Sequence, residues 1–149
     1  MEKILGTQPL ERQSFMKRIF ETLLVTSDRL IVARTKGSFM TGGVVGALHY
    51  MDSAKEAKEK GEALTEASPE SILNADKDNY AIPKAEIQKI EIRSRIGATL
   101  FHTTTTKETH KWFLSAKEMG WTKSSIHEDI KNLENILRPI FGDKLSVKK

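Results

Sequence analysis

The chain has 149 residues, of which 30% are charged and 38% hydrophobic, a composition typical of one soluble globular domain rather than of a disordered segment. It has no cysteine, which excludes disulfides, thiolate zinc sites, iron–sulfur clusters and a thiol nucleophile. The net charge of +4 permits contact with phosphate or an anionic membrane surface, although a mixed solvated surface is the simpler interpretation.

The first twenty residues fit two alternatives. In the stretch LERQSFMKRIF, the apolar side chains could share one face of a short helix, and the same stretch could equally form a first strand. The segment from Met1 to Phe15 has no apolar core of signal-peptide length and carries early acidic residues. We therefore expect a cytoplasmic protein.

Two β-rich runs follow, separated by a polar break. Residues 23–25 read Leu-Leu-Val and residues 30–32 read Leu-Ile-Val. Ser27 and Asp28 lie between them, and short polar side chains of this kind bond the backbone of a tight turn. The pattern predicts a β-hairpin.

An insertion of about residues 37–80 is expected after this hairpin. It opens with the glycine-rich stretch KGSFMTGGVVGALHY. Residues 52–66 are rich in Ala, Lys and Glu and predict an exposed helix. Ser68 as N-cap and Pro69 at the first helical position predict a second, short helix, and residues 76–80 predict a loop.

Strands are predicted again after the insertion. The stretch AIPKAEIQKIEIR places Ile90 and Ile92 on one face and charged side chains on the other, namely Lys89, Glu91 and Arg93. Further strands are predicted over residues 99–106 and 111–115, which are rich in β-branched and aromatic side chains. Short turns join these strands, so we expect an antiparallel meander.

The C-terminal segment carries the strongest helical pattern, over about residues 124–141. Its apolar residues recur at spacings of four, three, four and three, at Ile126, Ile130, Leu133, Leu137 and Ile140. Ser125 and Glu128 fit a capping box, and Pro139 and Gly142 mark the expected end. The apolar stripe needs a surface to cover, and the meander is the candidate.

Two local patterns in this layout resemble the pleckstrin-homology-like superfold, especially its GRAM-type and prokaryotic forms. They are LLVTSDRLIVA, at Leu23–Ala33, and IPKAEIQKIEI, at Ile82–Ile92. The resemblance covers about residues 20–141 and implies a mostly β fold with α, which we expect to form one domain over residues 1–149. Its bent antiparallel sheet would form a partial barrel capped by the C-terminal amphipathic helix. No basic cluster crosses the first hairpin turn, so phosphoinositide binding is not carried over.

The glycine-rich stretch does not fit a phosphate-binding loop. Gly37 and Gly42 have the required spacing, but Gly43 and Val44 stand where a lysine and a hydroxyl residue are needed. The apolar run is also shorter than the about 20 residues that span a bilayer. Shallow insertion into a membrane surface, or packing on the domain or on a partner, remain as alternatives.

Metal and catalytic patterns are weak. A calcium loop starting at Asp76 would need a glycine where Ala81 stands and a glutamate where Ile87 stands. His102 and His110 flank one predicted hairpin, which predicts that they face each other, but such a pair is more often part of the packing or the surface than a zinc site. We expect no metal and no cofactor.

Other charged and aromatic residues are assigned to structure. We assign Glu128 and Asp129 to the exposed side of the last helix, and Trp112 and Trp121 to the core. Arg93, Arg95, Lys107 and Lys111 are expected to be solvent-facing charges. Arg95 and Lys107 are expected in turns at opposite ends of one strand, so these two form no single patch.

These observations favour a non-enzymatic binding module. Its partner would be another protein or a second copy of the chain, and no nucleic acid is expected. The first alternative is weak binding of anionic membrane lipids through the insertion and the nearby cations Arg34 and Lys36. The second is a small histidine-dependent enzyme. The candidate contact residues are Arg34, Lys36, Phe39, Met40, Val44, Val45 and Leu48.

Overall fold

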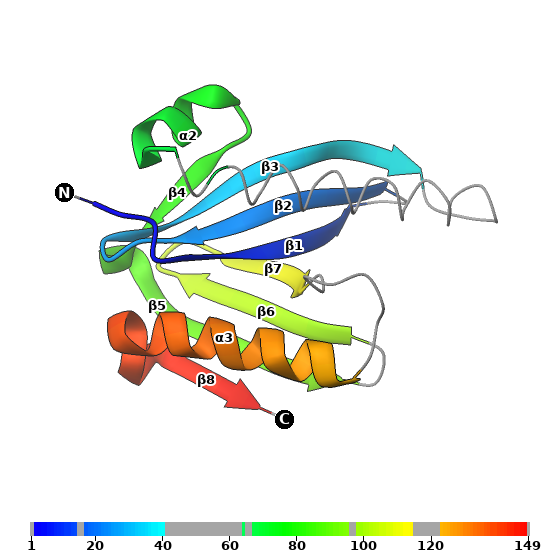
Figure 1. The fold of residues 1–149 in the computed structure, drawn as a ribbon, viewed down its shortest axis with the longest axis vertical. Helices are drawn as coiled ribbons and strands as arrows, with labels where there is room; N and C mark the ends of the chain where they lie inside the picture. Colours follow the sequence, from blue (N-terminus) through cyan, green and yellow to red (C-terminus); the bar gives the residue numbers. More distant parts are fainter. Residues whose placement is uncertain are drawn as a thin grey trace.

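A single curved sheet forms most of the molecule (Figure 1). The computed structural model describes residues 2–14, 17–40, 64, 67–95, 98–114 and 123–148. Its strands are β1 (Gly6–Ser14), β2 (Lys17–Val25), β3 (Arg29–Met40), β4 (Tyr80–Pro83), β5 (Ile87–Arg95), β6 (Ala98–Thr105), β7 (Thr109–Leu114) and β8 (Leu145–Lys148). They lie in the order β4-β3-β2-β1-β7-β6-β5-β8.

The N-terminal residues form two strands. β1 and β2 pair antiparallel from Gly6 opposite Val25 to Ser14 opposite Lys17. The helical alternative for this region is therefore wrong, and the strand alternative is confirmed. Leu10 is fully buried between neighbouring strands, and burial of such side chains on one face stabilises the strand conformation.

The β2–β3 hairpin is confirmed, and Thr26 organises its turn. The Thr26 hydroxyl accepts hydrogen bonds from the backbone N–H groups of Asp28 and Arg29, at 3.2 and 3.1 Å. The Thr26 backbone N–H donates to the Arg29 carbonyl at 3.0 Å. A hydroxyl that satisfies two turn amides fixes the tight reversal that the sequence placed at Ser27 and Asp28.

The boundaries of the insertion differ from the prediction. β3 continues to Met40, so residues 37–40 belong to a strand rather than to an insertion. The helix expected over residues 52–66 lies outside the described residues, apart from Leu64. The short helix α2 (Pro69–Ala75) is confirmed, and its N-cap hydroxyl, Ser68 Oγ, accepts from the Ser71 N–H at 3.2 Å.

The second half of the sheet is the predicted meander. β5, β6 and β7 pair antiparallel in sequence order. A short 3₁₀ helix, Lys84–Glu86, leads from β4 into β5. Ile90 and Ile92 are fully buried, as the alternation predicts.

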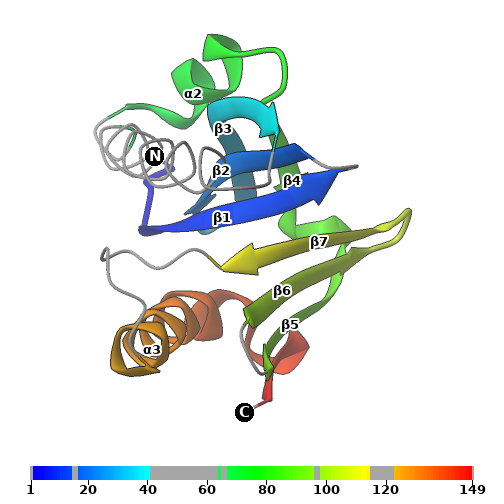
Figure 2. The same ribbon diagram turned by 90° about the vertical axis from the view of Figure 1, so that its right-hand side faces the viewer.

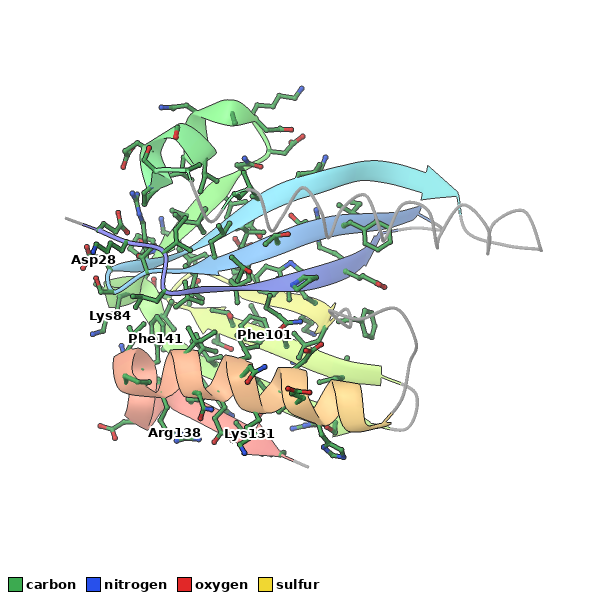
Figure 3. All side chains as sticks on the ribbon, in the orientation of Figure 1. Asp28, Lys84, Phe101, Lys131, Arg138 and Phe141 are labelled. Atoms are coloured by element: carbon green, nitrogen blue, oxygen red, sulfur yellow. The ribbon has the colours of Figure 1, made fainter. Side chains whose placement is uncertain are left out.

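Helix α3 (Lys123–Phe141) packs on the sheet (Figure 2). Ser125 lies inside this helix rather than before it, so the capping-box prediction is wrong. The apolar stripe is confirmed by the burial of Ile130, Leu133 and Leu137 in the core. Lys131 and Arg138 lie on the opposite, exposed side of the helix (Figure 3).

The chain continues beyond α3 into structure that the sequence did not predict. Pro139 lies in the last turn, the helix ends at Phe141, and a 3₁₀ turn over Gly142–Lys144 follows. β8 then pairs parallel to β5, with Ile90 opposite Leu145. The sheet is therefore mixed, and the expectation of an all-antiparallel sheet is wrong.

The sheet curves strongly enough to bring distant strands together. Tyr80 on β4 and His110 on β7 are separated by three strands in the sheet order, yet their rings stack with centroids 5.7 Å apart. The main core lies on this concave side, together with the apolar stripe of α3. A smaller core lies on the other side, where Ile72 of α2 covers Leu24, Ile31 and Ala33.

Candidate functional site

Arg34 is a predicted contact residue whose side chain the structure places. Its guanidinium Nη1 lies 3.0 Å from Asp78 Oδ2, and the side chain is 25% exposed. Its backbone N–H donates to Asn79 Oδ1 at 2.7 Å. The loop before β4 is thereby attached to β3. Arg34 is thus an ion-paired residue and not an unpaired surface cation.

The other predicted contact residues divide into two groups. Lys36, Phe39 and Met40 share the distal half of β3, where Met40 pairs with Lys17 of β2. Val44, Val45 and Leu48 lie outside the described residues. Three of the predicted contact residues therefore share one strand. A contact through Val44, Val45 and Leu48 stays a prediction.

The outer edge of β3 is only partly covered. β4 pairs with Arg29, Leu30, Ile31 and Val32 and with no later residue of β3. Asn79 then bonds the Arg34 N–H. From Lys36 to Met40, no strand pairs with this edge within the described part of the chain. An unpaired strand edge presents N–H and C=O groups that another strand can bond.

A buried carboxylate lies on the concave side of the sheet, one strand from Arg34. Glu21 on β2 is opposite Arg34 in the pairing register, and its side chain is 1% exposed. Glu21 Oε1 accepts from Arg12 Nε at 3.1 Å and from Trp112 Nε1 at 3.2 Å. Two donors, one of them charged, offset the cost of burying this carboxylate.

A row of rings covers the same region. His110 stacks on Tyr80 and on Trp112, with ring centroids 5.7 and 5.6 Å apart. Trp112 is 2% exposed, which confirms its assignment to the core. Burial, and then the nearby Glu21 carboxylate, raise the pKa of the Tyr80 hydroxyl. We name Arg12, Glu21, Tyr80, His110 and Trp112 the Glu21 cluster.

The strand register separates the two histidines that the sequence paired. His102 lies opposite Lys111, whereas His110 lies opposite Thr103. Side chains alternate between the faces of a strand, so His102 lies on the outer face and His110 on the concave face. The expectation that they face each other is therefore wrong. Within the residues that the structure describes, no three His, Asp or Glu side chains gather as metal ligands would.

Charged residues gather on the outer face of β5 and β8. Glu91 lies 3.2 Å from Lys89 Nζ, 3.0 Å from Arg93 Nη2 and 3.6 Å from Lys148 Nζ. The hydrogen bond from Lys89, followed by the charges of Arg93, Lys148 and Lys89, lowers the pKa of Glu91 against the opposing effect of burial. Lys148 belongs to β8, which the sequence pattern did not reveal, so this cluster was missed.

Asp129 also differs from expectation. The sequence predicts an exposed Asp129, but the residue is buried, with 7% exposed. Glu128 beside it is exposed, as expected. The difference arises because neighbouring helical residues lie about 100° apart around the axis, so the two need not share a face.

Among the described residues, no helix is long and apolar enough to cross a membrane. No protein-family model and no curated protein sequence matches the chain.

A solved structure with a similar fold is the hSac2 domain from the human phosphoinositide phosphatase Sac2. The match has a TM-score of 0.54 and 12% sequence identity, and it covers 99% of this chain and 77% of that one. An identity this low is evidence for the fold alone. The chain has a pleckstrin-homology-like fold over nearly its whole length, as the sequence resemblance implied.

Proposed function

We propose that this pleckstrin-homology-like domain is a non-enzymatic binding module that pairs with another polypeptide, a second copy of the chain included, along the distal half of β3. In this proposal the curved sheet is a partial barrel capped by α3, and the glycine-rich insertion follows the contact strand. The module works in the cytoplasm and needs no cofactor.

The observation that carries the proposal is the edge of β3. The strand extends to Met40, whereas β4 pairs only with residues 29–32. Strand addition at such an edge obtains its affinity from main-chain hydrogen bonds and its specificity from alternate side chains. The candidate residues Lys36, Phe39 and Met40 lie on this half of the strand.

The Glu21 cluster supports a structural role rather than catalysis. Glu21 accepts hydrogen bonds from Arg12 and Trp112, and the His110 ring stacks on Tyr80 and Trp112. A catalytic base needs access to its substrate's proton. The histidine-enzyme alternative keeps a direct test, since His102→Ala and His110→Ala would abolish any activity that depends on them.

The ion pair with Asp78 makes Arg34 less available to a lipid phosphate, which weakens the lipid-binding alternative. Co-sedimentation with vesicles of phosphatidylcholine and phosphatidylserine at low ionic strength tests it. Binding that disappears after Lys36→Gln would favour the lipid alternative over the strand-edge contact.

Sedimentation velocity tests the proposed contact through self-association. We expect the mass of the native chain to rise with concentration and to stay monomeric in the Phe39→Lys variant, because charged residues on a strand edge oppose pairing. Leu5→Lys is the matched control, since Leu5 is 53% exposed and lies before β1. Equal association of both variants would contradict the β3 contact.

A further inference from the structure

A second surface, distinct from the β3 edge, carries a concentrated positive charge. It lies on the outer face of the strands β8, β5, β6 and β7. We name it the Glu91 face and define it by Lys89, Glu91, Arg93, His102, Lys111 and Lys148. The Glu91 face and the proposed β3 contact share no residue, so an experiment can contradict one proposal without affecting the other.

The pairing register places these residues side by side. Glu91 lies opposite His102, and His102 lies opposite Lys111 on the next strand. On the other side of β5, Arg93 lies opposite Lys148. Residues that are directly opposite in neighbouring strands project from the same face of the sheet. One continuous surface therefore spans four strands.

The charge of this face is strongly unbalanced. The face carries four cations and one carboxylate, and three of the cations, Lys89, Arg93 and Lys148, lie within 3.6 Å of Glu91. Lys89, Arg93 and Lys148 nevertheless remain 54%, 38% and 53% exposed at their side chains. Glu91 thus holds the cations together without neutralising them, and their remaining donors are available to another anion.

An apolar position borders the cations. Phe113 is 38% exposed, and it lies opposite Leu100, which in turn lies opposite Arg93. Glu11, on the far side of Phe113, is buried at 3% exposure. Aromatic residues and arginine are enriched in protein interfaces relative to the rest of the surface.

We propose that the Glu91 face binds an acidic protein segment, with carboxylates on the cations and an apolar side chain beside Phe113. A second copy of this chain is disfavoured, because two such faces would repel each other. A nucleic acid strand would require several stacking rings, and Phe113 is the one exposed ring on this face among the described residues. An anionic membrane would favour a larger basic cluster without a central carboxylate.

Fluorescence anisotropy with a labelled glutamate peptide that carries one central leucine tests the proposal. The native chain should bind the peptide at low ionic strength and more weakly as salt is added. The triple variant Lys89→Gln, Arg93→Gln and Lys148→Gln should bind about eightfold more weakly, if each exposed charge contact contributes about twofold.

The matched control removes the same charge elsewhere. Lys77→Gln, Lys84→Gln and Lys131→Gln change three exposed lysines outside the Glu91 face, and this variant should bind nearly as well as the native chain. Lys111→Glu is a second face variant that disturbs no ion pair of Glu91, and its control is Lys77→Glu. Circular dichroism verifies folding in each case.

Several results would overturn the proposal. One is an absence of peptide binding at low ionic strength, and another is an equal loss in the face and control variants, which would indicate net charge alone. Tighter binding of an oligothymidylate of equal charge, or of phosphatidylserine vesicles, would assign the face to a different class of partner. None of these results bears on self-association through β3.

Discussion

At the scale of single residues, the Glu21 cluster shows what the sequence could not reveal. Its members come from β1, β2, β4 and β7, and Tyr80 of β4 meets His110 of β7 only because the sheet curves. The spacing of residues along the sequence cannot predict such a contact between distant strands. The buried state of Ile90 and Ile92, by contrast, followed directly from alternation along one strand.

The hydrogen bond from Trp112 to Glu21 should contribute measurably to stability. Trp112→Phe removes the Nε1 donor from a carboxylate that is 1% exposed, so we expect a loss of about 1–3 kcal/mol in the free energy of unfolding. Urea denaturation measures it. Phe113→Leu, at the partly exposed neighbour, should change stability by less, and equal losses would contradict a specific role for the hydrogen bond.

Tyr80 should make the fold sensitive to alkali. Burial raises its pKa in the folded chain above the ordinary value of 10.0. Its stabilising effect is therefore complete below pH 10 and is lost as the pH rises from 10 toward the folded pKa, because the unfolded chain ionises first.

Urea denaturation over this pH range measures the effect. The midpoint should fall as the pH rises above 10, and Tyr80→Phe should make this fall shallower. An identical pH dependence in the variant would show that Tyr80 does not cause it.

At the scale of elements, prediction succeeded where a pattern was local and periodic. The β2–β3 hairpin, the helix α2 and the apolar stripe of α3 follow from turn residues, a cap and helical spacing. β8 has four residues, and it is stabilised by pairing with β5 rather than by a pattern of its own. Predicting β8 would have required knowing where the chain lies in three dimensions after α3.

The contact between α3 and β1 depends on the absence of a side chain at Gly6. A Cβ atom there would collide with Ile136 Cδ1 and lie 3.0 Å from Ile136 Cγ1. We expect Gly6→Val to destabilise the fold by about 1–3 kcal/mol through overpacking.

A double-mutant cycle tests this contact. Gly6→Val combined with Ile136→Ala should lose less stability than the sum of the two single changes, because the second change makes room for the first. Additive losses, measured by thermal unfolding, would place the strain of Gly6→Val elsewhere.

At the scale of the whole molecule, the order of elements was sufficient to indicate the fold class. The chain contains strands joined by short turns and one amphipathic helix with a single apolar stripe. Few arrangements of these elements bury every apolar face. The mixed character of the sheet and the partner-binding surfaces depend on pairings between distant segments, such as β5 with β8. The fold also does not determine function, which is carried by sites on its surface.

Hydrogen exchange along β3 measures the proposed strand-edge contact. In a self-associating sample, we expect the amides of residues 36–40 that point away from β2 to become more protected as the protein concentration rises. Those of Arg29–Val32, already covered by β4, should not change. Association without added protection over Lys36–Met40 would contradict the proposed contact.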